Sequence, residues 1–182
     1  MMAGDSDETR LTEIMARCMS ELLAEMKVPA ERISGVLQPP STGESIAAFC
    51  GFGNNEMRGS FTLLGTSKLF ARLHPLPPHV HPRDLADLAC ELANQSVGRF
   101  RNRMFAYGVR LAPSLPQSVL AEQLQLLHSA SRQSHPTPLA FSIEGMALEG
   151  WFDVEMQPGF RLAAEPLEEE AGVLNEGAVL IF

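Results

Sequence analysis

The stretch from Pro82 to Ala106 is the feature that most constrains the fold of this chain. Its apolar residues recur every three or four positions, which places them on one side of an α-helix. They are Leu85, Leu88, Ala89, Leu92, Val97, Phe100 and Met104. Pro82 suits the first helical position, and Asp84 puts a negative charge near the positive end of the helix dipole. The pattern predicts a helix from Pro82 to about Ala106 that buries one side against another layer.

The opposite side of this predicted helix is polar. It carries Asp87, Glu91, Asn94, Gly98 and Arg101. Glu91 and Asn94 are three residues apart, so their side chains project side by side. A carboxylate and a carboxamide are therefore offered together to whatever docks there, and these two residues are the leading functional candidates.

The remaining segments predict an α+β domain. Residues 8–27 place apolar side chains on one stripe, which predicts an amphipathic helix that Pro29 ends. The predicted strands are residues 32–37, 45–52, 57–64, 107–111, 139–143 and 148–156, and the further predicted helices are residues 67–73 and 117–127. We expect the first three strands to form an antiparallel meander.

A short internal echo favours two related halves. Residues 48–49 and 59–63 resemble residues 140–141 and 150–154. Each half would be a helix followed by three strands. The long helices would then pack on one face of a shared antiparallel sheet, giving a two-layer domain. Chance is the alternative, since strands draw on few residue types.

Length and composition predict one domain. A chain of 182 residues with 45% apolar content can bury one substantial core. We expect residues 1–7 to be a flexible N-terminus and residues 8–160 to form the domain. Residues 161–182 read as an acidic connector with an apolar end, which is either a terminal strand or a docking tail.

Charge and hydropathy exclude several classes of partner. The formal net charge is −8, with 22 acidic against 14 basic residues, whereas nucleic-acid binding needs a concentrated basic surface. No signal peptide is evident, and no apolar run reaches the roughly 20 residues that span a bilayer. Cys18, Cys50 and Cys90 are odd in number and lie in apolar stretches, which is typical of buried thiols in a reducing compartment. We expect a cytoplasmic protein without nucleic-acid or membrane partners.

Three histidines in the proline-rich segment 74–82 suggest a metal site at first sight. His74, His79 and His81 have no acidic or cysteine ligand among the prolines around them. A plain loop is therefore favoured, and no metal site is predicted.

The polar side of the predicted helix resembles a known signature. Asp87, Glu91 and Asn94, with Gly98 one turn later and Pro116 a little over twenty residues beyond Asn94, are similar to the signature of the CheC/CheX/FliY chemotaxis phosphatases. The order of predicted helices and strands also resembles that family over roughly residues 8–157. The resemblance implies the CheC-like fold.

The first predicted helix lacks a second copy of this motif. Ala16 follows three residues after Glu13, and Ala24 follows three residues after Glu21, where double-headed CheC-type members carry a second Glu-x-x-Asn. The chain therefore resembles the CheX-like members, which have a single site, and this resemblance implies a homodimer.

The resemblance implies a phosphatase that acts on a CheY-like receiver domain phosphorylated on aspartate. The receiver would bring its own Mg²⁺ and lysine, so this chain would need no cofactor of its own. A carboxamide can orient the attacking water without bringing net charge toward the phosphoryl group, and we assign this role to Asn94. Glu91 would pair with the receiver's lysine. Further partner contacts are assigned to Asp87, Gly98, Arg101 and Pro116.

Two other functions stay open. A non-catalytic dimeric adaptor on the same fold would bind a receiver along the same helix without accelerating hydrolysis. A structural protein would instead dimerise through the strand that contains Trp151 and dock its tail, residues 171–182, elsewhere.

Overall fold

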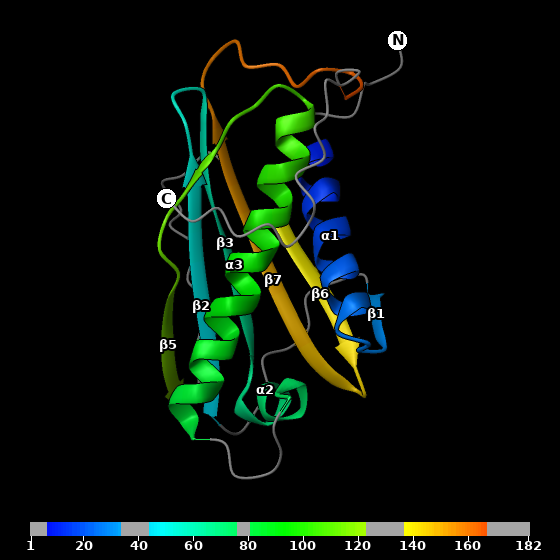
Figure 1. Ribbon diagram of the computed structural model, residues 1–182, viewed down its shortest axis with the longest axis vertical. Coiled ribbons are helices and arrows are strands. Elements are labelled where there is room, and N and C mark those ends of the chain that lie inside the picture. Colours follow the sequence, from blue (N-terminus) through cyan, green and yellow to red (C-terminus); the bar gives the residue numbers. More distant parts are fainter. Residues whose placement is uncertain (1–6, 34–43, 76–80, 123–136, 167–182) are drawn as a thin grey trace.

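The computed structural model describes residues 7–33, 44–75, 81–122 and 137–166 (Figure 1). Within these ranges, three helices pack on a seven-stranded antiparallel sheet, which confirms the predicted α+β class. The helices are α1 (Asp7–Glu25), α2 (Ser67–Leu73) and α3 (Pro82–Ala106). The strands are β1 (Ala30–Ile33), β2 (Glu44–Gly53), β3 (Met57–Thr66), β4 (Ala112–Pro113), β5 (Gln117–Glu122), β6 (Thr137–Ile143) and β7 (Met146–Met156).

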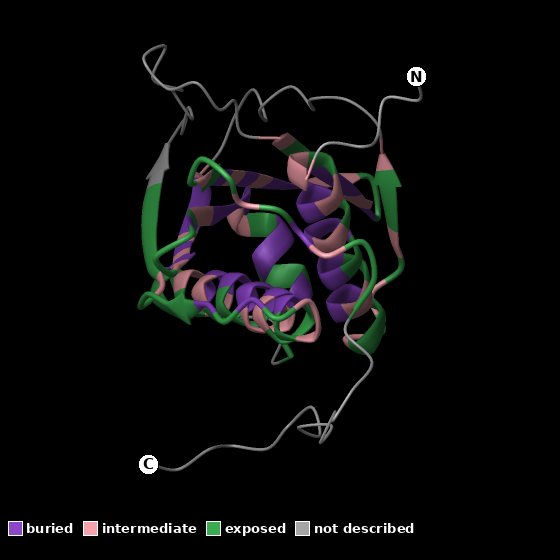
Figure 2. Cartoon of the chain, turned by 90° about the horizontal axis from the view of Figure 1, so that it is seen from above, coloured by how far each residue is buried: buried purple, intermediate pink, exposed green. Residues whose placement is uncertain are grey.

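Both long helices lie in front of the sheet and form the second layer (Figure 1). Seen from above, the buried residues fill the space between these helices and the sheet (Figure 2). The helical predictions for residues 8–27, 67–73 and 82–106 are confirmed. The strand predictions for residues 45–52, 57–64, 139–143 and 148–156 are also confirmed, with each strand slightly longer than expected.

The segment that follows α3 differs from its prediction. Residues 107–111 are not a strand, because the chain reverses there with Gly108 at a φ of 78°. Val109 donates its backbone N–H to the Met104 carbonyl at 2.9 Å and closes the helix end. Val109 and Leu111 are buried against the core. Their alternating burial is what made this turn resemble a strand.

The helix predicted for residues 117–127 is also wrong in its described part. Residues 117–122 form β5, which pairs along β2 from Phe49↔Gln117 to Glu44↔Glu122. Pairing with an existing strand outweighs the local helical pattern, because strand formation depends on tertiary context. Residues 123–127 lie outside the described residues.

The strand order runs β1-β6-β7-β3-β2, with β4 and β5 both pairing with β2. The predicted meander of the first three strands is therefore wrong for its first member. Of the three predicted members, β2 and β3 form a hairpin, whereas β1 pairs with β6 at the far edge of the sheet. Each half of the chain thus adds its first strand to the hairpin of the other half.

The two central strands, β3 and β7, pair in a symmetric register. Phe61 lies opposite Phe152, Gly59 lies opposite Val154, and Leu63 lies opposite Gly150. This is the pairing that a local twofold axis between Phe61 and Phe152 requires of the related segments 59–63 and 150–154. It supports a duplicated α+β unit.

The other part of the echo has no structural counterpart. Ala48 lies opposite Leu63, whereas Ala140 lies opposite Glu149 rather than Val154. Residues 48–49 and 140–141 therefore do not occupy equivalent positions, and their similarity carries no evidence for duplication.

An aromatic cluster anchors α3 on the sheet. The Phe100 ring lies 5.1 Å from Phe52 on β2 and 5.2 Å from Phe152 on β7, measured between ring centroids. Glycine makes room beside these rings: a Cβ on Gly59 would lie 2.6 Å from the Phe52 ring and 2.3 Å from the Asp153 carbonyl oxygen. The buried side of α3 is fixed by this packing, and the opposite side remains exposed.

Ion pairs between the two long helices fix the rotation of α3 further. Arg99 donates to Glu25 on α1, and Arg103 pairs with Glu21 one turn earlier on α1. Ser96, which is fully buried, donates its hydroxyl to the Leu92 carbonyl at 2.7 Å and contacts the Met19 sulfur. The side of α3 that carries Ser96, Arg99 and Arg103 therefore packs against α1.

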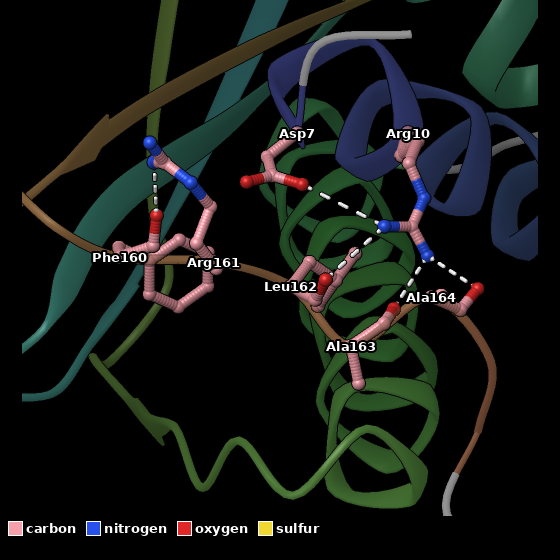
Figure 3. Close-up of polar contacts among 7 residues, drawn as sticks. All are labelled: Asp7, Arg10, Phe160, Arg161, Leu162, Ala163 and Ala164. Carbon is pink, nitrogen blue, oxygen red and sulfur yellow. Dashed lines mark hydrogen bonds and ion pairs between the residues drawn. The ribbon is translucent and has the colours of Figure 1, made fainter. Parts of the chain in front are cut away.

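Arg10 holds the chain that follows β7 (Figure 3). Its guanidinium donates to the carbonyl oxygens of Leu162, Ala163 and Ala164 at 3.2, 2.6 and 2.9 Å. Asp7 lies 3.6 Å away, and the Tyr107 ring at the end of α3 lies 5.9 Å from the guanidinium carbon. Residues 162–164 are thereby tied to α1, and the apolar C-terminal end lies outside the described residues.

Candidate functional site

The exposed side of α3 carries the predicted site residues in one row. Asp87, Glu91 and Asn94 are exposed, and Gly98 and Arg101 are partly exposed. At 3.6 residues per turn they fall within an arc of about 80°. The row, which we call the α3 stripe, is opposite the side that packs on the sheet, as the sequence pattern predicted.

The stripe has one further member, Phe105, which the sequence analysis missed. Its ring is 54% exposed, and the Arg110 guanidinium lies 5.4 Å from the ring centroid. Phe105 stands seven residues after Gly98, so the helical period was an available signal. A single apolar ring on a polar side gives no functional signal by itself, because single exposed hydrophobic residues are common.

Glu91 is held by a neighbour on its own helix. Gln95 donates its side-chain N–H to Glu91 Oε1 at 2.6 Å, across one helical turn. Gln95 was not among the predicted site residues, although its i,i+4 spacing from Glu91 is visible in the sequence. The hydrogen bond restricts the rotamers of Glu91 and leaves acceptor capacity on the other carboxylate oxygen.

The Asn94 side chain makes no hydrogen bond to any residue that the structure describes. Its carboxamide has one acceptor oxygen and two N–H donors. Next to it on the stripe, a Cβ placed on Gly98 would meet no atom within 4 Å. Asn94 therefore lies beside open space into which another molecule can come close to the helix backbone.

The edge strand beside α3 contains a β-bulge. Phe52 and Gly53 lie opposite Pro113 and Ala112, but Phe49 lies opposite Gln117. The register shifts by one residue between these pairs, so Leu115 and Pro116 together face Cys50. Bulges of this kind bend an edge strand and often occur next to binding sites.

Hydrogen bonds hold the residue that precedes the bulge. The Ser114 backbone N–H donates to the Gly51 carbonyl at 2.8 Å, and the Gly51 N–H donates to Ser114 Oγ at 2.8 Å. The chain direction into the bulge is thus fixed on β2.

The bulge is level with the middle of the α3 stripe. Burial raises the pKa of the Cys50 thiol, nearby Cys90 raises it further, and Arg101 lowers it. Cys50 lies in the core two residues before Phe52, whose ring contacts Phe100. Because β2 and α3 run in the same direction (Figure 1), Cys50 lies beside α3 about one turn before Phe100, in the section that contains Asn94 and Gly98. Pro116, opposite Cys50, is brought to the same region.

Arg101 connects the edge segment to the stripe. Its Nε–H donates to the Leu111 carbonyl at 2.8 Å. The structure thus brings all the predicted site residues to one side of the molecule, but it engages Arg101 within the chain. A contact from Arg101 to a partner stays a prediction.

Glu13 and Glu21 of α1, neither of which begins a Glu-x-x-Asn motif, are engaged in ion pairs. Glu13 accepts two hydrogen bonds from Arg32 at 2.8 and 2.9 Å, which lowers the pKa of its carboxyl, and Glu21 pairs with Arg103. In sequence, neither has an asparagine three residues on. These carboxylates support the packing of α1.

Within the described residues, no group of three or more histidine, cysteine or acidic side chains is placed to hold a metal ion. His79 lies outside the described residues, while His81 caps α3 by accepting from the Arg83 N–H at 3.2 Å. No helix of the described chain has the length and apolar content needed to cross a membrane.

Comparison with known proteins gives structural matches only. No family model matches the sequence, and no curated protein matches it. Chemotaxis protein CheX from Vibrio vulnificus superposes with a TM-score of 0.66 at 13% identity, over 83% of this chain and 100% of that one.

Two further solved structures agree. A chemotactic CheC-like protein from Shewanella oneidensis gives a TM-score of 0.65 at 14% identity, covering 81% of this chain and 99% of that one. A chain of the CheX–CheY–BeF₃–Mg²⁺ complex from Borrelia burgdorferi gives 0.61 at 15% identity, covering 80% and 97%. The chain has the fold of the CheX and CheC-like chemotaxis proteins, as its signature helix predicted.

Proposed function

We propose that this chain is a CheX-like phosphatase that accelerates hydrolysis of the aspartyl phosphate of a CheY-like receiver domain. The observation that carries the proposal is the pair Glu91 and Asn94, exposed side by side on the α3 stripe of a chain with the CheX fold. A structural neighbour in complex with CheY supports a receiver as the partner.

Hydrolysis of an aspartyl phosphate requires mainly that the attacking water be aligned with the phosphoryl group. An aspartyl phosphate is an activated acyl phosphate, and its hydrolysis needs a water in line with the leaving oxygen while cations neutralise the phosphoryl charge. The receiver would supply Mg²⁺ and its lysine. This chain would add Asn94, whose carboxamide oxygen accepts a hydrogen bond from the water without bringing net charge. A carboxylate at this position would repel the phosphoryl oxygens.

Glu91 would dock the helix by pairing with the receiver's lysine. Gln95 already holds one carboxylate oxygen at 2.6 Å, so the second oxygen is presented in a restricted range of positions. A charge-assisted bond of this kind strengthens as the interface excludes water.

The other stripe residues would complete the interface. Asp87 would contact the receiver one turn before Glu91, Gly98 would admit its backbone, and Pro116 would shape the bulge beside Asn94. Because a receiver is a cytoplasmic signalling module, we place this chain in the cytoplasm. We also expect a homodimer formed through the sheet, which analytical ultracentrifugation would test.

The direct test is the decay of receiver domains labelled with acetyl phosphate, with and without substoichiometric amounts of this protein. The wild type should accelerate the decay of at least one receiver, and Asn94→Ala should abolish the effect. Asn102→Ala is the matched control, because Asn102 is also an exposed asparagine of α3 but lies off the stripe. It should behave as the wild type.

Failure of this test separates two functions. Unchanged decay of every receiver by the wild type would refute the phosphatase. If the wild type still bound a receiver, the chain would be a receiver-binding adaptor, since an exposed Glu91 and Asn94 also suit docking without turnover.

A further inference from the structure

The large apolar side chains that are exposed are concentrated in one short part of the described chain. They are Phe105, Leu115, Val119 and Leu120, exposed by 54, 86, 46 and 39%. All four lie between the end of α3 and the edge strand beside it, and α3 and β5 are in contact (Figure 1). Single exposed apolar residues need no explanation, but four of them between residues 105 and 120, beside a candidate site, do.

The pairing of β5 with β2 shows which of these side chains lie on the helix side. Leu120 lies opposite Ile46, which belongs to the core beneath the helices, and Val119 lies opposite Ala47, which does not. Directly opposed residues project to the same side of a sheet. Leu120 therefore stands on the α3 side of β5, and Val119 stands on the other side.

Leu115 is on the same side of the sheet as Leu120. It lies in the bulge opposite the helix-facing Cys50, level with Asn94 and Gly98 on the stripe. At 86% exposed, it makes almost no use of its apolar surface within the chain. Phe105 stands at the end of the stripe. Phe105, Leu115 and Leu120 therefore lie on the side of the molecule that carries Glu91 and Asn94.

We propose that Phe105, Leu115 and Leu120, which we call the apolar rim, are the surface that a CheY-like receiver buries when it docks on the α3 stripe. The inference rests on the proposed function and assigns the part of the interface that supplies affinity. Glu91 and Asn94 orient the reacting groups, and the rim holds the receiver in place.

The energetics of docking favour this division. A charged pair such as Glu91 with a lysine mainly sets orientation and association rate at an interface, because the desolvation of both charges offsets much of their attraction. Interfaces instead depend on a few well-buried apolar or aromatic anchors surrounded by polar contacts. Three of the four exposed large apolar side chains of the described chain, Phe105, Leu115 and Leu120, are on the α3 side of the sheet. One partner that covers Asn94 is therefore placed to bury them as well.

The open space at Gly98 makes simultaneous contact feasible. A Cβ there would meet nothing within 4 Å, so a receiver segment has room to approach the helix at this position. Arg110 lies against the Phe105 ring and restricts its motion. Phe105 therefore presents a partly ordered ring at the end of the stripe.

The test measures the affinity of beryllofluoride-activated receiver domains, with Mg²⁺, for the full chain and its variants. Leu115→Ala and Phe105→Ala should each weaken binding roughly tenfold. The matched control is Val119→Ala, which removes an exposed apolar side chain from β5, four residues after Leu115 but on the other side of the sheet, and should bind as the wild type. Thermal unfolding of Leu115→Ala should be unchanged, because the side chain is almost fully exposed.

Each outcome decides between the rim and the proposed function. If Leu115→Ala and Phe105→Ala bound the receiver as tightly as the wild type, the rim would not be the docking surface. The proposed phosphatase activity would still hold if turnover persisted. A wild type that binds a receiver without hydrolysing it would refute the phosphatase, whereas weakened binding by the variants would still support the rim. If no receiver bound the wild type, both the docking role of the rim and the phosphatase activity would be refuted. A Leu115→Ala variant that lost self-association, with unchanged receiver affinity, would make the rim an interface between copies of this chain and overturn the proposal.

Discussion

Replacing Gly98 by alanine should stabilise the fold and weaken receiver docking at the same time. Gly98 lies inside α3, where glycine costs about 1 kcal/mol relative to alanine because its backbone loses more freedom on folding. The added methyl would meet no atom within 4 Å, so no clash opposes this gain. We expect the free energy of unfolding to rise by about 1 kcal/mol.

The size of the effect makes it measurable. For a domain of this size, 1 kcal/mol corresponds to a rise in Tm of about 2–4 °C. The same methyl would occupy the open space beside Asn94, where the receiver backbone is proposed to approach. Receiver affinity should therefore fall, and Gly98→Leu should lower it further. Opposite changes in stability and binding are typical of residues kept for function.

Differential scanning calorimetry and the affinity of beryllofluoride-activated receivers would test both parts. Gly150→Ala is the control for the calorimetry, since its Cβ would lie 2.9 Å from the Phe61 ring and should lower Tm. A lower Tm for Gly98→Ala would contradict the placement of Gly98 in a helix with open space around its Cα. A higher Tm with unchanged receiver affinity would refute a close approach at Gly98.

Two further changes probe the core and the sheet. Phe100→Ala should lower the free energy of unfolding by about 3–5 kcal/mol in guanidinium denaturation, because it removes a fully buried ring from the contact between α3 and the sheet; a loss below about 1 kcal/mol would contradict that packing. Burial raises the pKa of the Glu149 carboxyl above its usual 4.5, and the nearby Trp151 indole offsets part of this shift. A carboxyl raised in this way contributes stability that is complete below its unfolded pKa and is lost as pH rises through the folded pKa. Glu149→Gln should therefore gain stability over the wild type as pH rises from 4 to 7 in urea denaturation, and a constant difference would contradict the shift.

The helices were predictable because their signals are local. Pro82 starts α3 as expected, and Thr66 caps α2 by accepting from the Leu69 N–H at 3.1 Å. The exposed positions of Glu91 and Asn94 followed from the helical period alone. Their placement needed no knowledge of the rest of the fold.

The errors concern segments whose structure is decided by distant residues. Nothing within residues 117–122 indicates that β2 will recruit them as an edge strand, and nothing in residues 30–33 indicates pairing with β6. The bulge at Leu115 and Pro116 depends on the register of two strands that are more than sixty residues apart. Leu115 was missed for the same reason, because its exposure follows from that register.

The most direct test of the central claim separates turnover from binding at Asn94. With receiver at saturating concentration, Asn94→Ala should lower kcat roughly 100-fold, the loss expected when the attacking water is no longer aligned. The Kd for the beryllofluoride-activated receiver should stay within about threefold of the wild type, because an exposed carboxamide adds little to affinity. An unchanged kcat, or a Kd that weakens in proportion to the loss of turnover, would contradict the assignment of Asn94 as the residue that orients the water.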